Sequence, residues 1–336
     1  MFKSLPEAAG DPILALMGAF RADPRPGKID LGVGVYRDET GATPIFKAVR
    51  EAEKRLHDAQ TTKSYVALDG DLDFVARTAK VAMGEEIAAR ASGVQAVGGS
   101  GAVFVLARLM LRAKPDAVVH LPDPTWPNHY NIVGAAGGAL TRYPYYDVSG
   151  RVLRFDAMAA ALEKLGPGDV VLLHGCCHIP TGADPDAAQW EAIADIAARR
   201  GWTPFFAVAY QGFGDGLEED AAGMRKVLNA VPEAFVALSY SKSMGLYRDR
   251  VGAAFAVCAD QAGKERTQAT LASINRETFS FPPDHGAALA RIILEDDALR
   301  ADWADELERM RIRVATIRAK LAEALAQRPG GQGWTF

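Results

Sequence analysis

Short apolar runs recur along the middle of the chain and alternate with longer segments of mixed polarity. The runs occupy residues 117–121, 169–174, 204–209, 234–238 and 251–257. Such near-continuous apolar runs are typical of strands that are covered on both faces in a mostly parallel sheet. Between two of them, residues 187–200 place Trp190, Ile193 and Ile196 on one side of an amphipathic helix. This alternation predicts an α/β fold.

One long helix is predicted near the end of the chain. Asp296 and Asp297 carry side chains that favour a helix N-terminus. Apolar residues then follow at intervals of three or four positions: Leu299, Trp303, Leu307, Met310, Val314, Ile317, Leu321 and Leu325. We expect the helix to end before the run Pro329-Gly330-Gly331, which cannot continue it.

Four side chains that could bind a ligand or react with it come at or just after the ends of predicted strands. They are Trp126, His178, Tyr210 and Lys242. In open α/β sheets, ligands bind at the carboxyl ends of the strands. We therefore expect these side chains to line one site.

The segment around Lys242 carries the most specific chemical signal. Lys242 is flanked by Ser241 and Ser243, and Arg250 follows eight residues later. A lysine amine condenses with a carbonyl only when it is deprotonated, so its pKa must fall through burial or a nearby cation. An arginine can hold a phosphate with two parallel hydrogen bonds. The arrangement suits a lysine that binds a phosphate-bearing aldehyde, although an isolated lysine is more often a solvated surface residue.

A glycine-rich stretch, Gly98-Gly99-Ser100-Gly101-Ala102, precedes an apolar helical segment at 103–111. Glycines let backbone N–H groups approach a phosphate, and the N-terminus of a helix favours negative charge. Such a loop alone is weak evidence, but together with Arg250 it indicates a phosphate site.

Composition narrows the class of protein. The chain has 336 residues, of which 49% are hydrophobic and 24% charged, and its net charge is −4. These values give no reason to expect a nucleic-acid or membrane partner. No apolar run approaches the roughly 20 residues that span a bilayer. The N-terminus has no apolar signal-peptide core.

The three cysteines do not form a disulfide framework. We expect them to be reduced, in a cytoplasmic protein. The adjacent Cys176 and Cys177, with His174 and His178 nearby, could suggest a metal centre. Zinc sites need a gap between cysteines, so packed thiols are the better interpretation and no metal is expected.

The motifs together resemble the class I pyridoxal-phosphate (PLP) aminotransferases, in the aspartate and aromatic amino acid subgroup. The resemblance runs nearly from Met1 to Gln327. It rests on residues 32–36, 98–102, 123–129, 174–178, 209–213, 239–253 and 282–287. It implies a PLP fold-type I large domain at residues 40–300. It also implies an incomplete small domain made of residues 1–39 and 301–336, with the long final helix.

The resemblance implies PLP as the cofactor and Lys242 as the catalytic lysine that binds it. Trp126 resembles the aromatic residue that stacks on the cofactor ring, and Tyr210 the tyrosine that hydrogen-bonds its phenolic oxygen. As single residues, both could instead be buried core side chains. The implied cofactor-binding set is Gly98, Gly99, Ser100, Trp126, Tyr210, Ser239, Lys242, Arg250 and Tyr65.

Some of the implied residues act across a homodimer interface. Tyr65, Arg276 and Ser280 resemble residues that reach the partner subunit's site. Arg276 would bind the side-chain carboxylate of a dicarboxylic substrate, although it could also be an ordinary surface cation. Gly34, Trp126 and Arg276 form the implied substrate set.

Three departures from the family pattern stand out. Ala207 occupies the position of the aspartate that pairs with the pyridine nitrogen and makes the ring an electron sink. This leaves His129, expected behind that aspartate, without its partner. Ile179 occupies the position of an asparagine that donates to the phenolic oxygen. Family members also continue beyond the position of Phe336, and the resemblance places the arginine that holds the substrate α-carboxylate in that part.

The resemblance therefore implies an aminotransferase that moves an amino group between an amino acid of the aspartate or aromatic type and a 2-oxo acid. The alternative is a non-catalytic relative that holds PLP or binds a partner. The departures at Ala207 and Ile179 leave both open.

Overall fold

The computed structural model describes residues 2–4, 12–32 and 34–328. Contacts divide the chain into two units, Met1–Pro44 and Ile45–Phe336, which are described separately. The first unit contains the short helix η1 (Phe2–Ser4) and helix α1 (Pro12–Ala22). The ammonium of Lys28 closes the end of α1 by donating to the carbonyl oxygens of Phe20 and Asp23, each at 2.7 Å. The domain boundaries that the resemblance implies stay a prediction.

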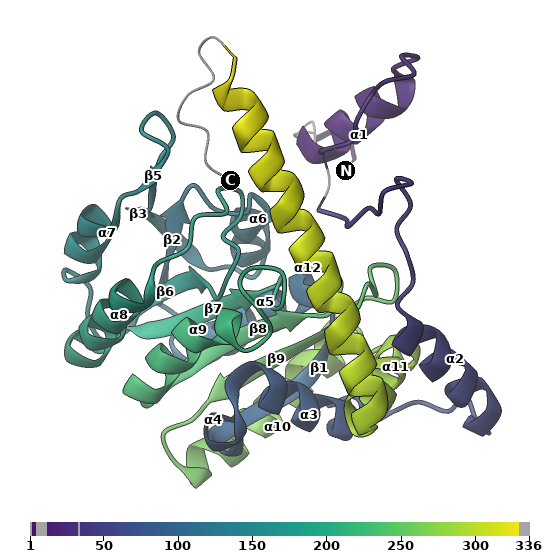
Figure 1. Ribbon diagram of the computed structural model, residues 1–336. Helices are drawn as coiled ribbons and strands as arrows, with labels where there is room; N and C mark the ends of the chain where they lie inside the picture. The colour runs from purple at the N-terminus through teal and green to yellow at the C-terminus, as the bar shows by residue number, and fades with distance from the viewer. Residues whose placement is uncertain (1, 5–11, 33, 329–336) are drawn as a thin grey trace. The chain divides into compact units, whose positions relative to one another are not determined.

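The second unit is built on a seven-stranded sheet (Figure 1). Its strands in chain order are β1 (Ala91–Val97), β2 (Val118–Asp123), β3 (Ala139–Pro144), β6 (Asp169–His174), β7 (Thr203–Val208), β8 (Ala234–Ser239) and β9 (Val251–Val257). Their order across the sheet is β1-β9-β8-β7-β6-β2-β3. All neighbouring pairs are parallel except the two that β9 makes, which are antiparallel. The predicted mostly parallel α/β sheet is confirmed, and β1 and β3 are strands that the apolar runs did not indicate. A two-stranded ribbon, β4 (Tyr146–Asp147) with β5 (Val152–Leu153), lies outside this sheet.

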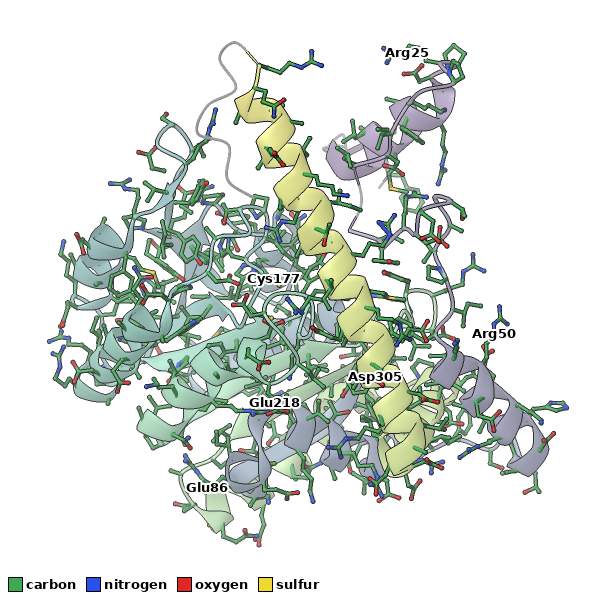
Figure 2. All side chains as sticks on the ribbon, viewed as in Figure 1. Arg25, Arg50, Glu86, Cys177, Glu218 and Asp305 are labelled. Carbon is green, nitrogen blue, oxygen red and sulfur yellow. The ribbon has the colours of Figure 1, made fainter. Side chains whose placement is uncertain are left out.

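In the part of the second unit that the structure describes, residues 45–328, eleven helices connect and cover these strands. They are α2 (Lys47–Ala59), α3 (Leu72–Met83), α4 (Glu85–Arg90), α5 (Gly98–Ala113), α6 (Asn128–Ala135), α7 (Phe155–Leu162), α8 (Ala187–Arg200), α9 (Glu219–Ala230), α10 (Gln261–Thr278), α11 (Asp284–Glu295) and α12 (Asp297–Ala326). Helix α8 has the predicted bounds because Asp186 and Gln189 form a capping box at its start. Gly201, at a φ of 73°, ends it. Charged residues on the outer helix faces, such as Glu86 and Asp305, are exposed (Figure 2).

The two faces of the sheet are separated by the alternation of side chains along each strand. Phe205 of β7 belongs to the apolar cluster formed with α5 and α10. Its neighbour Phe206 points the other way and lies 6.2 Å, between ring centroids, from Trp190 of α8. Both faces of the sheet are therefore covered, which explains why the strands read as continuous apolar runs.

Helix α12 is buried in its first half only. Asp296 caps it by accepting hydrogen bonds from the backbone N–H groups of Ala298 and Leu299. Trp303 and Leu307 are fully buried, as the pattern predicts. Ile317 and Leu321, which continue the same apolar pattern, are 47% and 45% exposed. The predicted stop at 329–331 lies outside the described residues. No helix in the described ranges is long and apolar enough to cross a bilayer.

Strand β1 forms one edge of the sheet, and a side-chain amide covers it. Gln268 of α10 accepts from Gly93 N–H and donates to Gly93 C=O, both at 3.0 Å. Asn275 of the same helix donates to the carbonyl of Gln95 at 3.0 Å. The amide of Gln268 thus replaces part of a neighbouring strand, which protects an edge that could otherwise pair with another chain.

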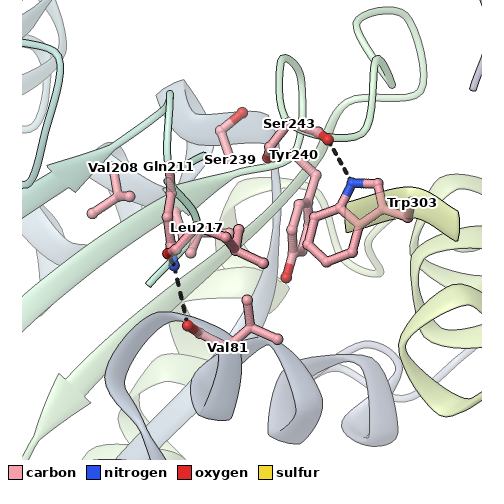
Figure 3. A pocket seen from close by; sticks show the side chains of 9 residues that line it. Val81, Val208, Gln211, Leu217, Ser239, Tyr240, Ser243 and Trp303 are labelled. Carbon is pink, nitrogen blue, oxygen red and sulfur yellow. Dashed lines mark hydrogen bonds between the residues drawn. The ribbon is translucent and has the colours of Figure 1, made fainter. Parts of the chain in front are cut away.

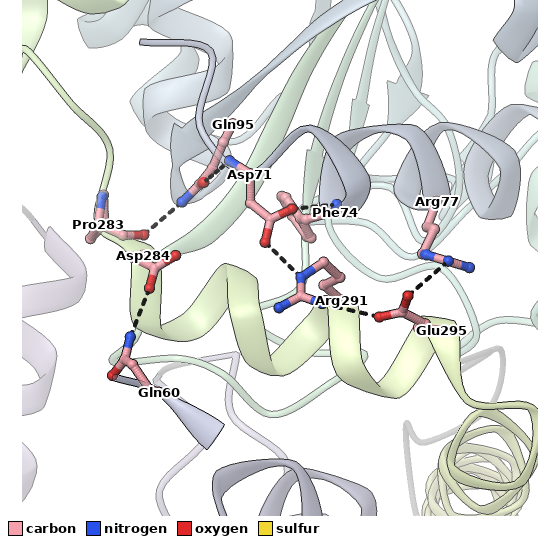
Figure 4. A network of polar contacts seen from close by, with 9 residues as sticks. All are labelled: Gln60, Asp71, Phe74, Arg77, Gln95, Pro283, Asp284, Arg291 and Glu295. Atoms are coloured by element: carbon pink, nitrogen blue, oxygen red, sulfur yellow. Dashed lines mark hydrogen bonds and ion pairs between the residues drawn. The ribbon is translucent and has the colours of Figure 1, made fainter. Parts of the chain in front are cut away.

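A polar network continues this edge toward α11 (Figure 4). The side chain of Gln95 donates to Pro283 C=O at 2.6 Å and accepts from Asp71 N–H at 3.0 Å. Asp71 in turn pairs with Arg291 at 2.8 Å, and Arg291 also bonds Glu295 at 3.0 Å. The network fixes the start of α3 against α11.

We predict that Gln268→Leu lowers the free energy of unfolding by about 1–3 kcal/mol, because both backbone groups of Gly93 lose their partner. Urea unfolding provides the measurement. Gln261→Leu is the matched control, since Gln261 is exposed on the same helix and bonds only Glu265. Equal losses in the two variants would contradict the edge-capping role.

Candidate active site

The carboxyl ends of the parallel strands bring the predicted site residues to one edge of the sheet. Trp126 follows β2, His178 follows β6, Tyr210 follows β7 and Lys242 follows β8. Because these strands are mutually parallel, their carboxyl ends share this edge. The predicted gathering of these residues is therefore supported by the topology.

Lys242 lies in a tight turn after β8 and is half-buried. Its ammonium nitrogen lies 4.8 Å from the centroid of the Tyr210 ring. Burial, and then the positive charge of Arg250, lower the pKa of Lys242. Both causes are those that a reactive amine needs. Burial also raises the pKa of Tyr210 to about 12, so its hydroxyl stays protonated at neutral pH.

An anion cradle lies beside this turn, at the N-terminus of α5. Gly98 adopts a φ of +64°, and its N–H donates to the carbonyl of Arg250 at 2.8 Å. A Cβ built on Gly98 would lie 2.4 Å from Nη2 of Arg250. The guanidinium is thus held directly against the first turn of a 16-residue helix. A helix N-terminus and an arginine together favour a phosphate.

Serine hydroxyls complete the cradle. Ser239 and Ser241 are buried, and their Oγ atoms lie 3.0 Å apart. Arg250 donates to Ser241 Oγ at 3.4 Å and to Tyr247 C=O at 3.0 Å. In the sequence, Ser241 stands out only as a neighbour of Lys242. Its position, two residues after Ser239 and one before Lys242, is the sequence feature that could have identified it as part of the cradle. The residues present therefore fit a phosphate-bearing group next to a reactive amine.

A cluster of neutral imidazoles forms the other side of the site. Thr125 Oγ1 is hydrogen-bonded to His129 Nδ1 at 2.9 Å and to His174 Nε2 at 3.1 Å. The His178 ring lies 4.3 Å from that of His174 and is stacked on Tyr145 at 3.9 Å, between centroids. Burial lowers the pKa of His129 and of His178 to about 3, and that of His174 well below its usual value. All three rings are therefore uncharged at neutral pH.

Trp126 connects this cluster to the open part of the site. Its ring meets the His129 ring edge-on, with centroids 5.1 Å apart. Trp126 is only partly buried, so part of its ring remains available for stacking.

Ala207 and Ile179, which the resemblance suggests are departures from the family pattern, lie at the histidine cluster. Ala207 is paired in register with His174 on the next strand, and both belong to the sheet face that carries Phe205. Ala207 is partly exposed although Phe206 and Val208 beside it are buried, so the sheet is open above its methyl group. Ile179 N–H donates to Nδ1 of His174 at 3.2 Å.

Cys176 and Cys177 lie close to Asp220 in the folded chain. Cys176 is buried, while Cys177, labelled in Figure 2, is partly exposed, and both are free. Their sulfur atoms and a carboxylate oxygen of Asp220 lie within 4.8 Å of one another. The Asp220 carboxylate accepts backbone N–H bonds from Gly212 and Gly214 at 2.8 and 2.9 Å. It therefore holds the loop after Tyr210.

The residues expected to reach a partner subunit form their own exposed cluster. The Tyr65 ring, with the residue 84% exposed, stacks on Phe281 with centroids 4.7 Å apart. The Arg276 guanidinium lies 5.6 Å from the same ring and donates to Ser280. Phe281 was not singled out from the sequence. Gly34 belongs to the other unit and is exposed, and its neighbour Val33 lies outside the described residues.

Comparison with known proteins gives a consistent picture. The family model described as aminotransferase class I and II matches residues 26–336. The chain is 50% identical over 329 residues to a tyrosine aminotransferase from Rhizobium meliloti (strain 1021), covering 98% of this chain and 84% of that protein. It is 43% identical over 340 residues to an aspartate aminotransferase from Salmonella typhi, covering 100% and 86%.

A solved structure matches equally well. The aromatic-amino-acid aminotransferase from Burkholderia pseudomallei, covalently bound to pyridoxal phosphate, superposes with a TM-score of 0.94 at 39% identity. The match covers 98% of this chain and 84% of that one.

The buried imidazoles predict an acid-dependent stability. His129 and His178 take up protons only near pH 3 in the folded protein, against 6.5 for an ordinary histidine. Between these values the unfolded chain binds more protons, so the free energy of unfolding falls as pH decreases from 6.5 toward 3. His129→Gln should reduce this slope by up to about 1.4 kcal/mol per pH unit. Urea unfolding between pH 6.5 and 4 provides the measurement.

The exposed His57 gives the control for that experiment. His57→Gln makes the same substitution at an exposed position, and the effect of His129→Gln is measured against it. If His129→Gln and the wild type lose stability at the same rate on acidification, His129 is not the neutral buried group described above.

Proposed function

Because the chain belongs to the class I and II aminotransferase family, we propose that it transfers an amino group between an amino acid and a 2-oxo acid with PLP. The amino acid would be of the aspartate or aromatic type, as in the names of its relatives. The observation that carries the proposal is a half-buried lysine, with a lowered pKa, beside an arginine–helix anion cradle.

Some residues of the site would bind the cofactor, and others would move protons. The first turn of α5, with Ser239, Ser241 and Arg250, would bind the cofactor phosphate. Trp126 would orient the ring by stacking. When bound, PLP supplies the electron sink that makes the substrate α-proton removable.

Lys242 and Tyr210 would carry out the proton chemistry. The Nζ atom of Lys242, whose pKa is lowered by burial and then by the Arg250 charge, would attach the cofactor and then, once displaced, hold the α-proton of the substrate. The Tyr210 hydroxyl stays protonated and would donate a hydrogen bond to the cofactor.

We predict that Lys242→Ala abolishes the absorbance band that the protein acquires with PLP. Borohydride reduction followed by peptide mapping should place the wild-type label on Lys242. Lys226→Ala is the control, because Lys226 is exposed and paired with Glu191. A band unchanged in Lys242→Ala would mean that PLP reacts with surface lysines. Turnover of aspartate, tyrosine and phenylalanine with a dicarboxylic 2-oxo acid then tests the activity itself.

A second candidate function is a PLP-holding relative with little turnover. Ala207 and Ile179 favour it, because neither side chain provides the hydrogen bond that the family pattern places there. Lys242-bound cofactor without turnover of any of the three amino acids would support this second candidate over the first.

The variant Ala207→Asp tests whether the protein turns over slowly or does not turn over at all. The new carboxylate would lie beside His174 and could partner the pyridine nitrogen, so we predict a rise in kcat of about tenfold or more. Ala207→Asn has nearly the same shape without the charge and should give a much smaller rise. A kcat that responds equally to both substitutions would show that the charge at this position is not limiting.

We also propose a homodimer in which Tyr65 and Arg276 act on the partner's site. Support comes from their exposure, their joint packing on Phe281 and the resemblance at these positions. We place the dimer in the cytoplasm, because Cys176, Cys177 and Cys258 are free thiols, and expect neither a nucleic-acid nor a membrane partner.

Mixed dimers test this arrangement. Lys242→Ala subunits and Arg276→Ala subunits should each be impaired alone with a dicarboxylic substrate. Co-expressed, they should recover up to about a quarter of the wild-type activity, because half of the dimers are mixed and each holds one intact site. The absence of any recovery, with dimers verified by sedimentation, would contradict the shared site.

A further inference from the structure

The buried half of α12 contacts the turn that carries Lys242. Trp303 is fully buried, and its indole Nε1 donates to the carbonyl of Ser243 at 2.6 Å (Figure 3). Ser243 is the residue directly after Lys242. The edge of the Trp303 ring also meets Tyr240, with centroids 6.4 Å apart. The turn is therefore held by α12 through Trp303.

One turn further along the same face, α12 contacts the loop that follows Tyr210. Gly212 adopts a φ of +95°, and a Cβ built on it would lie 2.4 Å from Cδ2 of Leu307. A side chain at this position would adopt an unfavourable backbone conformation and would press on the side chain of Leu307. Arg311, another turn along, donates to Gly214 C=O at 3.4 Å. The loop and the helix are thus packed without spare room.

The space between the two loops is also filled. Val208, Gln211, Tyr240 and Trp303 face one another around a gap that admits no water molecule. Figure 3 shows Gln211 reaching across to α3, where its amide donates to Val81 C=O at 3.1 Å. A shift of α12 would therefore displace both loops rather than be absorbed between them.

These contacts lie next to Lys242 and Tyr210 in the chain. The two residues come from different strands, β8 and β7, and their side chains meet at 4.8 Å beyond the end of the sheet. Beyond the strands, the backbone is irregular and needs support from other elements. Trp303 and Leu307, four residues apart on one helix face, touch one loop each.

We propose that Trp303 and Leu307 are positioning residues, through which α12 sets the placement of Lys242 relative to Tyr210. This role goes beyond the burial of two core side chains. Of the two measurements described below, only the binding of PLP rests on the proposed function. The placement controls how far the amine is removed from water and how well it faces the bound group.

The test uses the full chain with Trp303→Phe, which removes the indole N–H, and Leu307→Ala, which removes the contact with Gly212. Leu299→Ala is the matched control. Leu299 is buried on the same face of α12, one turn before Trp303. Urea unfolding measures the stability of each variant. Leu307→Met, which keeps the side-chain volume, should behave like the wild type.

Two readouts report on Lys242 itself. The first is the dissociation constant of PLP, which should rise about five- to tenfold in Trp303→Phe and Leu307→Ala. The second readout needs no cofactor. The lysines are reductively methylated with ¹³C-formaldehyde, and the NMR signal of Lys242 is assigned as the one that is missing in Lys242→Arg. This signal is then followed as a function of pH. Its titration midpoint should move upward by about half a unit or more, as the amine gains access to water.

Leu299→Ala should lose stability without moving either readout. The proposal is overturned if Trp303→Phe and Leu307→Ala change the Lys242 midpoint no more than Leu299→Ala does. If the wild type binds no PLP, the proposed function fails, and the NMR midpoint alone decides the positioning role.

Discussion

The site depends on a close approach between two backbone segments at the end of the sheet. A Cβ built on Gly252 would lie 2.6 Å from the carbonyl carbon of Gly98, and Gly98 N–H donates to Arg250 C=O at 2.8 Å. A side chain at position 252 would collide with this backbone, and the φ of +64° at Gly98 also favours glycine. The contact joins the start of α5 to the start of β9, and so holds the Arg250 guanidinium against the helix N-terminus. The turn with Lys242 lies between β8 and β9, so the same contact fixes the end of the turn that leads into β9.

The sequence pattern predicted the inner strands well but not the edges of the sheet. β6 and β9 have the predicted bounds because they are apolar on both faces. β1 contains Ser92 and Gln95, which look like surface residues in the sequence but are 2% and 1% exposed. Their polar groups are satisfied by segments far along the chain, such as Lys264 C=O and Pro283 C=O. No local pattern can reveal partners at such separations.

The site residues also divide into those that a local sequence pattern reveals and those that meet only in the folded chain. Lys242, Arg250 and the glycine-rich turn could be identified because each belongs to a short motif whose chemistry is local. The support of Lys242 by Trp303 could not, since the two loops and α12 meet only in the folded chain. The histidine cluster is an intermediate case. Its members were visible near strand ends, and the hydrogen bond between Thr125 and His129 is local, but the one between Thr125 and His174 joins the segments after β2 and β6, which are paired in parallel.

The charges of the site are unevenly distributed, and this determines how a ligand would lie in it. One end holds Arg250, Lys242 and the positive end of the α5 dipole. The other end holds uncharged imidazoles, with the methyl group of Ala207 among them. A phosphate is favoured strongly at the first end and has no comparable partner at the second. A phosphate-bearing aldehyde would therefore enter with its phosphate at Arg250, and its ring would extend toward Trp126 and the histidines. The imidazoles at the second end are uncharged and Ala207 offers the ring only a methyl group, so the binding of the cofactor and the activation of its ring are physically separable in this chain.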